Sequence, residues 1–505
     1  MSPVRLTDLP VTGSFRASGK ARRLVSLKVF NTFTRTKEPF ETLEPGKVRM
    51  YVCGVTVYDR CHIGHARAYV AFDVILRYLR WRGYDVTYVR NFTDVDDKII
   101  RRSNEAGVPV TELTDTFIAA FHEDMAALGV GRADVEPRVT EHMPEIISMV
   151  QTIIDRGHGY EASGDVYFDI SSFPGYLKLS GRKLDDMQAG ASERVDPQEP
   201  QKRHPMDFAL WKAAKPGEPA WDSPWGPGRP GWHIECSAMS SKYLGEVFDM
   251  HGGGMDLIFP HHENERAQSW AATGKEFVRT WVHNGFVNVD SEKMSKSLGN
   301  FFAIRDVIAR FHPESLRYFL LTTHYRSPIN FTDSAVGEAE NRVEYLYETI
   351  QTACDYLART PAQADEPEVE AARERFVLTM DDDFNTAAAL ALVADTSRRL
   401  NDVLMMKGKA PDKAVGVATA LRILQNLGAV LGLCGQEPAV ILAGIRDCKL
   451  LRNGLDRGLI ETLVADRVAA RVAKDFVRAD VLRGELSGMG VVLMDGPEGT
   501  RWKIA

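Results

Sequence analysis

Cysteine is scarce in this chain. Six cysteines occur among 505 residues, and their spacing shows no pairs. They are Cys53, Cys61, Cys236, Cys354, Cys434 and Cys448. Disulfide frameworks are typical of small secreted domains, whereas dispersed single cysteines suit a reducing compartment. The composition therefore excludes a disulfide-stapled scaffold and indicates a cytoplasmic protein.

The chain also lacks long apolar runs and a strong excess of either charge. No run approaches the ~20 apolar residues that a membrane span requires, and no hydrophobic signal core follows the first basic residues. The net charge of -7 argues against a protein that coats nucleic acid indiscriminately, so any RNA contact must depend on local basic patches. We therefore expect a soluble protein with no membrane partner.

A short histidine motif follows the first apolar segment. Residues 48–54 are apolar and β-branched, which predicts a strand, and residues 66–72 are typical of a helix. The turn between them contains His62, Gly64 and His65. Gly64 would let adenine or ribose approach the backbone, and both histidines would donate hydrogen bonds to phosphate oxygens near the positive helix end. The alternative is a pair of surface histidines at a helix start.

A second motif carries two lysines in a polar, glycine-terminated segment, residues 290–300. Lys293 and Lys296 flank Met294 and Ser295. Two mobile ammonium groups can follow charge onto a departing pyrophosphate, and such charge must be stabilised in the transition state. A solvated basic loop is the common alternative for one such cluster. Together with the histidine motif, however, the segment indicates amino-acid activation on ATP.

Two cysteines, a histidine and a glutamate form a candidate zinc site. The four residues are Cys53, Cys236, His261 and Glu265. His261 and Glu265 are four residues apart, so on a helix they project from the same face, as two ligands of one ion must. The separations are long and unlike those of a zinc finger, and buried inert thiols are the usual alternative for single cysteines.

These motifs resemble those of the class I aminoacyl-tRNA synthetases. The chain is similar to the cysteinyl-tRNA synthetase family along nearly its whole length, from residues 28–32 to residues 495–497. Further matching stretches are residues 91–98, 251–256 and 259–265. The resemblance implies activation of L-cysteine by ATP with Mg²⁺, followed by transfer of cysteine to the 3′ end of tRNA(Cys). We also expect a monomer.

The resemblance assigns roles to individual residues. The zinc ligands that it implies are Cys53, Cys236, His261 and Glu265. The substrate pocket that it implies comprises Cys53, Thr93, Trp232, His251 and Asp256. The catalytic residues that it implies are His62, His65, Lys293 and Lys296. The ATP-binding residues that it implies are His62, Gly64, His65 and Lys296. In the family, the zinc ion takes the thiolate of the substrate in its remaining position.

A metal suits the selection of cysteine. Serine differs from cysteine only by oxygen in place of sulfur, and apolar shape discriminates by only ~10- to 200-fold. Zinc binds a thiolate strongly and a neutral hydroxyl weakly, and it lowers the pKa of the bound thiol. We therefore expect no editing domain.

The expected fold class is α/β, with a Rossmann-like parallel-sheet catalytic domain. A chain of 505 residues that is 44% hydrophobic can bury more than one core. Residues 25–323 alternate strand and helix patterns, with a Pro- and Gly-rich connective insertion at 181–230. Residues 324–440 are expected to form a helical bundle that contacts the tRNA stem, and residues 441–505 a small anticodon-binding domain. Residues 1–24 are expected to be a flexible extension.

One acidic and one basic cluster lie in the C-terminal part. The three aspartates at 381–383 favour a helix start, with acids near its positive end, over a metal site. The cations at 467, 471, 474 and 478 recur at helical spacing beside an apolar stripe at 464, 468, 472 and 476. This pattern predicts one helical face that meets RNA phosphates, with Trp502 available to stack on a base. Interleaved aspartates leave open a solvated surface with intrahelical ion pairs.

Two other functions are compatible with parts of the pattern. A related ligase joins cysteine to an amino sugar through the same adenylate chemistry, but it resembles only the catalytic half. A non-catalytic RNA-binding protein descended from a synthetase is the second alternative. The helical sequence beyond residue 323 disfavours the first, and the intact motifs disfavour the second.

Overall fold

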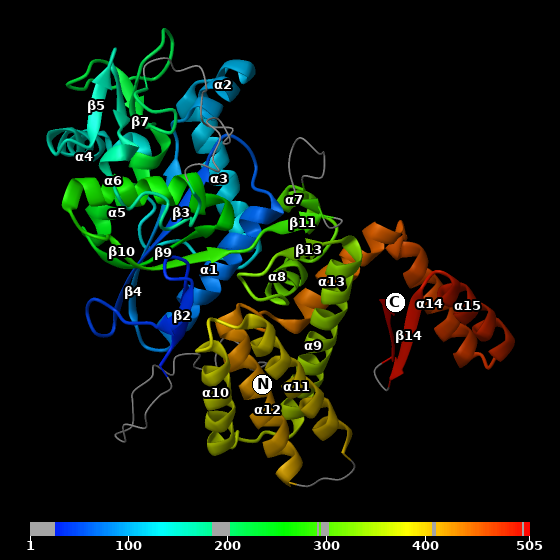
Figure 1. Cartoon of the computed structure of the whole chain (residues 1–505). Helices are drawn as coiled ribbons and strands as arrows, with labels where there is room; N and C mark the ends of the chain where they lie inside the picture. The colour runs from blue at the N-terminus through cyan, green and yellow to red at the C-terminus, as the bar shows by residue number, and fades with distance from the viewer. Residues whose placement is uncertain (1–25, 184–201, 290–291, 294–301, 407–410, 497–498) are drawn as a thin grey trace.

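The computed structural model of the protein describes residues 26–183, 202–289, 292–293, 302–406, 411–496 and 499–505. Its centre is a four-stranded parallel sheet of order β10-β9-β3-β4 (Figure 1). The strands are β3 (Lys47–Thr56), β4 (Asp85–Thr93), β9 (Phe248–Gly254) and β10 (Val278–Asn284). The first pair is joined by helix α1 (Ile63–Trp81). The parallel α/β fold predicted from the sequence is confirmed.

Strand order reverses at β3, which is where nucleotide sites form in such sheets. The chain proceeds from β3 to β4 on one side and later places β9 and β10 on the other. A short hairpin of β1 (Lys28–Asn31) and β2 (Thr36–Pro39) lies beside β10. The carboxyl ends of β3 and β9 therefore meet at the position that the sequence predicted for the histidine turn.

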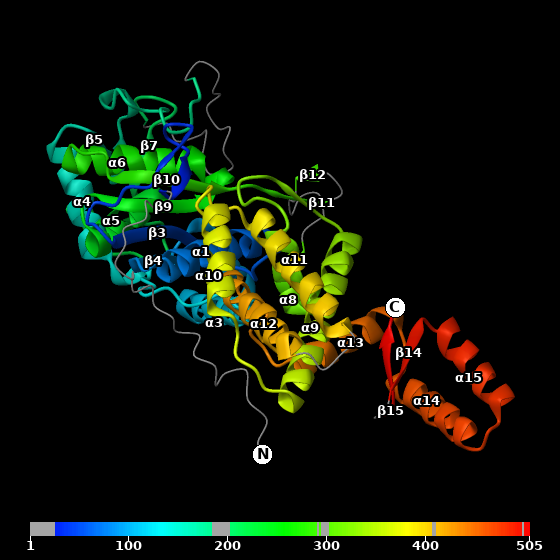
Figure 2. The same ribbon diagram turned by 90° about the horizontal axis from the view of Figure 1, so that it is seen from below.

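Alternation along β3 directs successive side chains to opposite faces of the sheet. Met50 and Val52 join the core that contains α1, whereas Tyr51 and Cys53 join the core that contains helix α5 (Trp232–Leu244). Figure 2 shows α6 (Glu263–Thr273) and α1 on opposite sides of the sheet. The period of two thus turns Cys53 towards α5 and α6.

An antiparallel sheet is inserted between the halves of the parallel sheet. Its order is β5-β6-β7-β8, with strands β5 (Gly159–Ala162), β6 (Asp165–Phe168), β7 (Phe208–Ala213) and β8 (Gly228–Pro230). It begins ahead of residue 181, where the sequence placed the insertion, and residues 184–201 lie outside the described residues. Trp211 of β7 is fully buried in the core that also contains α5.

Further helices surround these sheets. The α-helices of the first half are α2 (Asp97–Ala106), α3 (Val110–Ala127) and α4 (Met143–Asp155). Short 3₁₀ turns are η2 (Val139–Glu141), η3 (Ile170–Ser172) and η5 (Met255–Leu257), and the π-helical turn η6 (Ile258–His262) precedes α6.

A small sheet follows β10 and leads to the lysine segment. Its order is β12-β11-β13, with strands β11 (Val287–Val289), β12 (Glu292–Lys293) and β13 (Ile329–Phe331). Helices α7 (Ile304–Ile308) and α8 (Pro313–Leu321) lie between β12 and β13 in the chain. The strand β12 therefore carries Lys293 at the edge of this sheet.

Long helices follow, as the sequence predicted. They are α9 (Asp333–Arg359), α10 (Glu366–Met380), α11 (Thr386–Met405), α12 (Pro411–Leu431) and α13 (Pro438–Asn453). Residues of these helices and residues of β3 and α1 belong to one hydrophobic core. Within α12, Asp412–Leu431 is long and apolar enough to cross a membrane by length and composition alone, but 67% of its most apolar window is buried. This stretch is therefore a core helix of the helical region.

The last module has a core of its own and lies at the far end of the molecule from the parallel sheet in both views (Figures 1 and 2). It consists of α14 (Arg457–Val472), α15 (Phe476–Gly488), β14 (Val491–Gly496) and β15 (Gly499–Ile504). Trp502 lies in β15, and the Arg446 guanidinium covers one face of its ring at 5.0 Å.

The predicted basic face on one continuous helix is wrong. Helix α14 ends at Val472, and α15 begins at Phe476 after Lys474, whose φ is 61°. Arg467 and Arg471 lie on α14 and pair with Asp495 at 2.9 and 2.6 Å. The apolar stripe beside the cations is largely exposed, with Val472 at 79% and Phe476 at 63%. The left-handed residue before the Asp475 N-cap divides the pattern into two helices.

The three aspartates at 381–383 precede a helix, as expected, but they do not lie in its first turn. Helix α11 begins at Thr386, and the Asn385 side chain accepts the N–H of Ala388. Asp381 instead accepts the Tyr78 hydroxyl at 2.6 Å and pairs with Arg82. Asp383 contacts the first strand and the loop after α8, so the cluster joins the helical region to the catalytic half.

His312 provides a prediction about folding stability. Its neutral Nδ1 caps α8 by accepting the N–H of Glu314 at 3.2 Å, and burial lowers its pKa from 6.5 to about 4. The unfolded chain takes up this proton near pH 6.5 and the folded chain only near pH 4, so the contribution of His312 to stability is lost as pH falls through that window. Asparagine also accepts at an N-cap. His312→Asn should therefore reduce the drop in melting temperature between pH 7 and pH 5, and an unchanged drop would contradict the assignment.

Candidate active site

The histidine motif forms the N-terminal cap of α1. His62 Nδ1 accepts the N–H of Gly64 at 3.0 Å, and His65 Nδ1 accepts the N–H of His62 at 3.2 Å. The two rings stack with centroids 3.7 Å apart. Because both Nδ1 atoms accept, each neutral ring carries its proton on Nε2 and can donate from there. The motif thus brings two ring N–H groups to the positive end of a 19-residue helix.

The described residues that follow the lysine segment are hydrogen-bonded to the histidine motif. The N–H of Ile63 donates to the carbonyl of Phe302 at 3.1 Å, and the N–H of Ile304 donates to the carbonyl of Cys61 at 2.9 Å. At the upstream end, Lys293 pairs with Asn288 across β12 and β11. Lys296 lies outside the described residues. The described chain just after the lysine segment therefore lies against the histidine motif.

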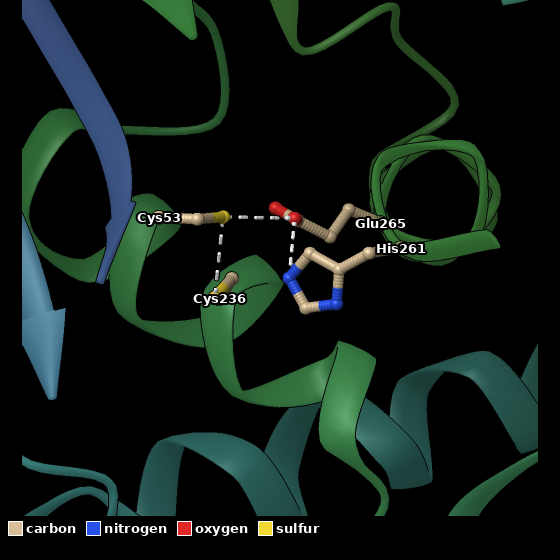
Figure 3. Close-up of side chains that lie close together, drawn as sticks. All are labelled: Cys53, Cys236, His261 and Glu265. Carbon is tan, nitrogen blue, oxygen red and sulfur yellow. Dashed lines mark hydrogen bonds and ion pairs between the residues drawn. The ribbon is translucent and has the colours of Figure 1, made fainter. Parts of the chain in front are cut away.

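Four predicted metal ligands converge from distant parts of the chain (Figure 3). Cys53 Sγ lies 3.7 Å from Cys236 Sγ and 3.4 Å from Glu265 Oε1, and His261 Nε2 lies 3.0 Å from the same oxygen. One ligand atom from each of the four residues lies within 4.8 Å of every other, and all four side chains are buried. They come from β3, α5, η6 and α6. A buried set of two thiols, an imidazole and a carboxylate fits zinc chemistry.

The four clustered side chains shift one another's pKa values. The hydrogen bond from Cys53, with help from His261, lowers the pKa of Cys236 to about 6. Although burial opposes it, the charge of Glu265 raises the pKa of His261 to about 9. Burial would raise the pKa of Glu265, but His251 and His261 hold it well below its usual range. Without an ion, the negative charge of Cys236 and Glu265 is partly balanced by the protonated His261, while burial raises the pKa of Cys53 and keeps it a thiol. A divalent ion would therefore displace protons from His261 and Cys53 on binding.

Further histidines contact the candidate metal ligands and hold them in place. His251 Nε2 lies 2.8 Å from Glu265 Oε2, and His233 Nδ1 lies 3.1 Å from His261 Nδ1. His262 and His283 are also in contact, with Nδ1 and Nε2 2.7 Å apart. Such contacts fix the orientation of metal ligands. The sequence analysis did not predict that His233, His262 and His283 would lie around the candidate metal ligands. The available signal was that His233 and His262 lie close in sequence to the predicted ligands Cys236 and His261.

Of the remaining predicted pocket residues, Trp232 and His251 contact candidate metal ligands directly. Thr93 ends β4 and its hydroxyl donates to Glu235 Oε2 at 3.1 Å. Trp232 begins α5, with its ring centroid 4.0 Å from that of His261. His251 is buried in β9, whereas Asp256 is exposed in η5. A Cβ on Gly254 would lie 2.3 Å from Asp256 Oδ1, the tip of an exposed side chain that can move aside.

Gly54, next to ligand Cys53, lies in close contact with β4. Its N–H donates to Asn91 Oδ1 at 2.8 Å, and a Cβ at this position would lie 1.5 Å from the Asn91 carbonyl oxygen. Gly54→Ala must therefore separate the two strands and displace Cys53. We expect a loss of about 1–3 kcal/mol in the free energy of unfolding, together with a lower zinc content.

The measurements are chemical unfolding and metal analysis of purified protein. Gly484→Ala on α15 is the control, since no atom lies within 4 Å of its Cβ position. A helical glycine replaced by alanine should be neutral or stabilising by up to about 1 kcal/mol. Zinc retained by Gly54→Ala at the parental level would contradict the close-contact argument.

Comparisons with known proteins agree with this geometry. Residues 39–341 match the family described as tRNA synthetases class I (C) catalytic domain, and residues 375–435 match the DALR domain. A Cysteine--tRNA ligase of Syntrophotalea carbinolica is 56% identical over 482 residues, covering 95% of this chain and 100% of that protein. The Geobacter metallireducens protein of the same name is 54% identical over 488 residues, with the same coverage of each chain.

Solved structures share the fold at low identity. The Mycobacterium tuberculosis methionyl-tRNA synthetase in complex with methionyl-adenylate matches with a TM-score of 0.59 at 17% identity, covering 78% of this chain and 93% of that one. The Agrobacterium radiobacter K84 LeuRS in its ternary complex matches with a TM-score of 0.57 at 14% identity, covering 80% and 86%. The fold, the converging motifs and the full-length relatives lead to one assignment. The chain belongs to the cysteine–tRNA ligase family of class I aminoacyl-tRNA synthetases.

Proposed function

We propose that the protein activates L-cysteine with ATP and transfers the cysteinyl group to the 3′ end of tRNA(Cys). The observation that carries the proposal is the buried cluster of Cys53, Cys236, His261 and Glu265 beside the sheet end at which α1 begins. A thiol-selective metal site next to a phosphate-binding helix end is what discrimination of cysteine at an adenylate site requires.

The four clustered residues would hold one zinc ion. When bound, zinc supplies a Lewis acid that prefers the thiolate of cysteine to the neutral hydroxyl of serine. His251 and His233 keep Glu265 and His261 in place for this task. Thr93, Trp232, His251 and Asp256 would form the walls of the amino-acid pocket. In this proposal the selection of substrate needs no editing domain.

ATP, with Mg²⁺, would lie at the N-terminus of α1. His62 and His65 would donate from Nε2 to phosphate oxygens, and Gly64 would allow the nucleotide to approach the backbone. A carboxylate oxygen of cysteine attacks the α-phosphorus, and the bond to the departing pyrophosphate breaks. Lys293 and Lys296 would stabilise the negative charge that moves onto pyrophosphate.

Transfer completes the reaction. A terminal ribose hydroxyl of the tRNA attacks the carbonyl carbon of cysteinyl-adenylate, the hydroxyl proton is lost, and AMP departs. The reaction needs no covalent enzyme intermediate, and positioning supplies much of the rate. We infer that residues 324–440 contact the tRNA stem and residues 441–505 the anticodon. We also infer a cytoplasmic monomer with a non-catalytic extension at residues 1–24.

The test is exchange of labelled pyrophosphate into ATP with cysteine or serine, followed by transfer of cysteine to a tRNA with the GCA anticodon. Exchange with cysteine alone, followed by transfer, supports the proposal. Exchange without transfer would instead favour a ligase that joins cysteine to a small molecule. A zinc-loaded sample without exchange would reject the catalytic proposal.

A further inference from the structure

The turn between α10 and α11 reaches into the catalytic half through Asp383. This side chain is fully buried. Its Oδ1 accepts the N–H of Phe30 at 2.9 Å and the hydroxyl of Tyr325 at 2.8 Å, while Oδ2 accepts Nε–H of Arg326 at 2.6 Å. One carboxylate therefore joins the helical region, the first strand and the loop between α8 and β13.

The backbone of this turn supports a role beyond packing. Asp383 has a φ of 64° and Phe384 a φ of 53°, a left-handed conformation that residues with side chains seldom adopt. The N–H of Asp383 also donates to the carbonyl of Lys28 at 2.9 Å. Strained backbone held by several bonds is characteristic of positions where geometry matters for function.

The loop that Asp383 holds, residues 322–328, is fixed from its other side by the histidine-motif helix. Arg67 lies on α1, two residues after His65, and is 1% exposed. Its Nη2 donates to the carbonyls of His324 at 2.7 Å and Thr323 at 3.2 Å. The loop is thus held between α1 and the helical region.

The same loop supports the strands that carry the first lysine. The N–H of Gly285 donates to the carbonyl of Tyr325 at 2.8 Å, immediately before β11. A Cβ at Gly285 would lie 2.5 Å from the Ser327 carbonyl, so the two backbone segments are in close contact. Strand β11 pairs in turn with β13 and with β12, which ends at Lys293.

We propose that Asp383 is a positioning residue for adenylate formation, which fixes loop 322–328 so that the strand bearing Lys293 keeps its place relative to α1. The inference rests on the proposed function, because Lys293 matters only if the protein activates an amino acid on ATP. It assigns to the helical region a part in the first chemical step, before any tRNA is bound.

The test compares Asp383→Asn with Asp382→Asn. Asp382 belongs to the same turn but pairs at the surface with Lys37 at 2.6 Å, so its variant controls for loss of a charge there. Asp383→Asn should lower kcat for cysteine-dependent pyrophosphate exchange by roughly 10- to 100-fold. Its zinc content and its KM for cysteine should remain parental, because no metal ligand contacts Asp383. Asp382→Asn should match the parent throughout.

Parental exchange by Asp383→Asn, or a loss of exchange in proportion to a loss of zinc, would overturn the proposal. Tyr325→Phe is the second variant, for use if Asp383→Asn fails to fold. It removes one hydrogen-bond donor to the same carboxylate and keeps the ring, so it should also lower kcat. Amide hydrogen–deuterium exchange of Val287–Val289 should be faster in Asp383→Asn than in Asp382→Asn. This measurement needs no enzymatic activity, so unchanged amide exchange rejects the positioning role even if the parent is inactive. An inactive parent by itself would reject only the proposed function.

Discussion

Cys236→Ser should nearly abolish the activation of cysteine. The Cys236 thiol lies 3.7 Å from Cys53 and has a pKa lowered to about 6, so it is the more readily ionised of the two thiols in the cluster. A serine hydroxyl stays protonated and binds zinc weakly. We expect kcat/KM for cysteine in pyrophosphate exchange to fall by roughly 10³-fold or more. Zinc content should fall with it, and the remaining preference for cysteine over serine should be small.

The control for this variant is Cys448→Ser. Cys448 is partly buried in α13 and belongs to no group of candidate metal ligands among the described residues. Its variant should keep parental zinc and activity. If Cys236→Ser binds a full equivalent of zinc and discriminates against serine as the parent does, the cluster does not select the substrate.

Lys296→Ala should lower the rate of adenylate formation by roughly 10²- to 10³-fold in kcat. The proposed partner of this ammonium group is the departing pyrophosphate, whose charge develops only in the transition state. The KM for cysteine should therefore remain parental, since an interaction made only in the transition state changes kcat and kcat/KM together. Steady-state pyrophosphate exchange at varied cysteine and ATP measures both parameters.

Lys275→Ala is the matched control for the lysine variant. Lys275 is exposed and pairs with Glu246 at 2.6 Å on the surface. Its loss should leave the kinetics parental. A Lys296→Ala variant with an unchanged kcat and a raised KM for cysteine would place this lysine in substrate binding instead.

The sequence predicted the centre of the molecule well because local patterns there agree with the global fold. Apolar, β-branched residues at 48–54 form β3, and the following helix begins within the histidine motif. The zinc cluster was different. Cys53 and Cys236 are 183 residues apart, so only sheet topology brings them together. Spacing could not predict that proximity, and the resemblance to a family supplied the ligand set.

The errors have equally specific causes. The four cations near residue 470 keep helical spacing, but a left-handed residue at Lys474 and the Asp475 cap end one helix and start another. The helical spacing of residues alone does not reveal such a break between two helices. The role of Asp383 was hidden for another reason, because its partner Phe30 is 353 residues away. Side chains that join remote segments leave no local pattern in the sequence.

The shared hydrophobic core has a consequence for how the chain can be divided. Val48 and Phe72 of the sheet-bearing half belong to the same core as Phe376 and Leu424 of the long helices, whereas the C-terminal module keeps a separate one. The boundaries of cooperative folding therefore do not follow the boundaries of function. A fragment of this chain that ends near residue 323 would expose the severed half of a core, so we expect it to be less stable than the full chain. Removal of the terminal module should disturb the remaining chain less, because the buried residues of its core include Leu450 of α13 but none of the parallel sheet.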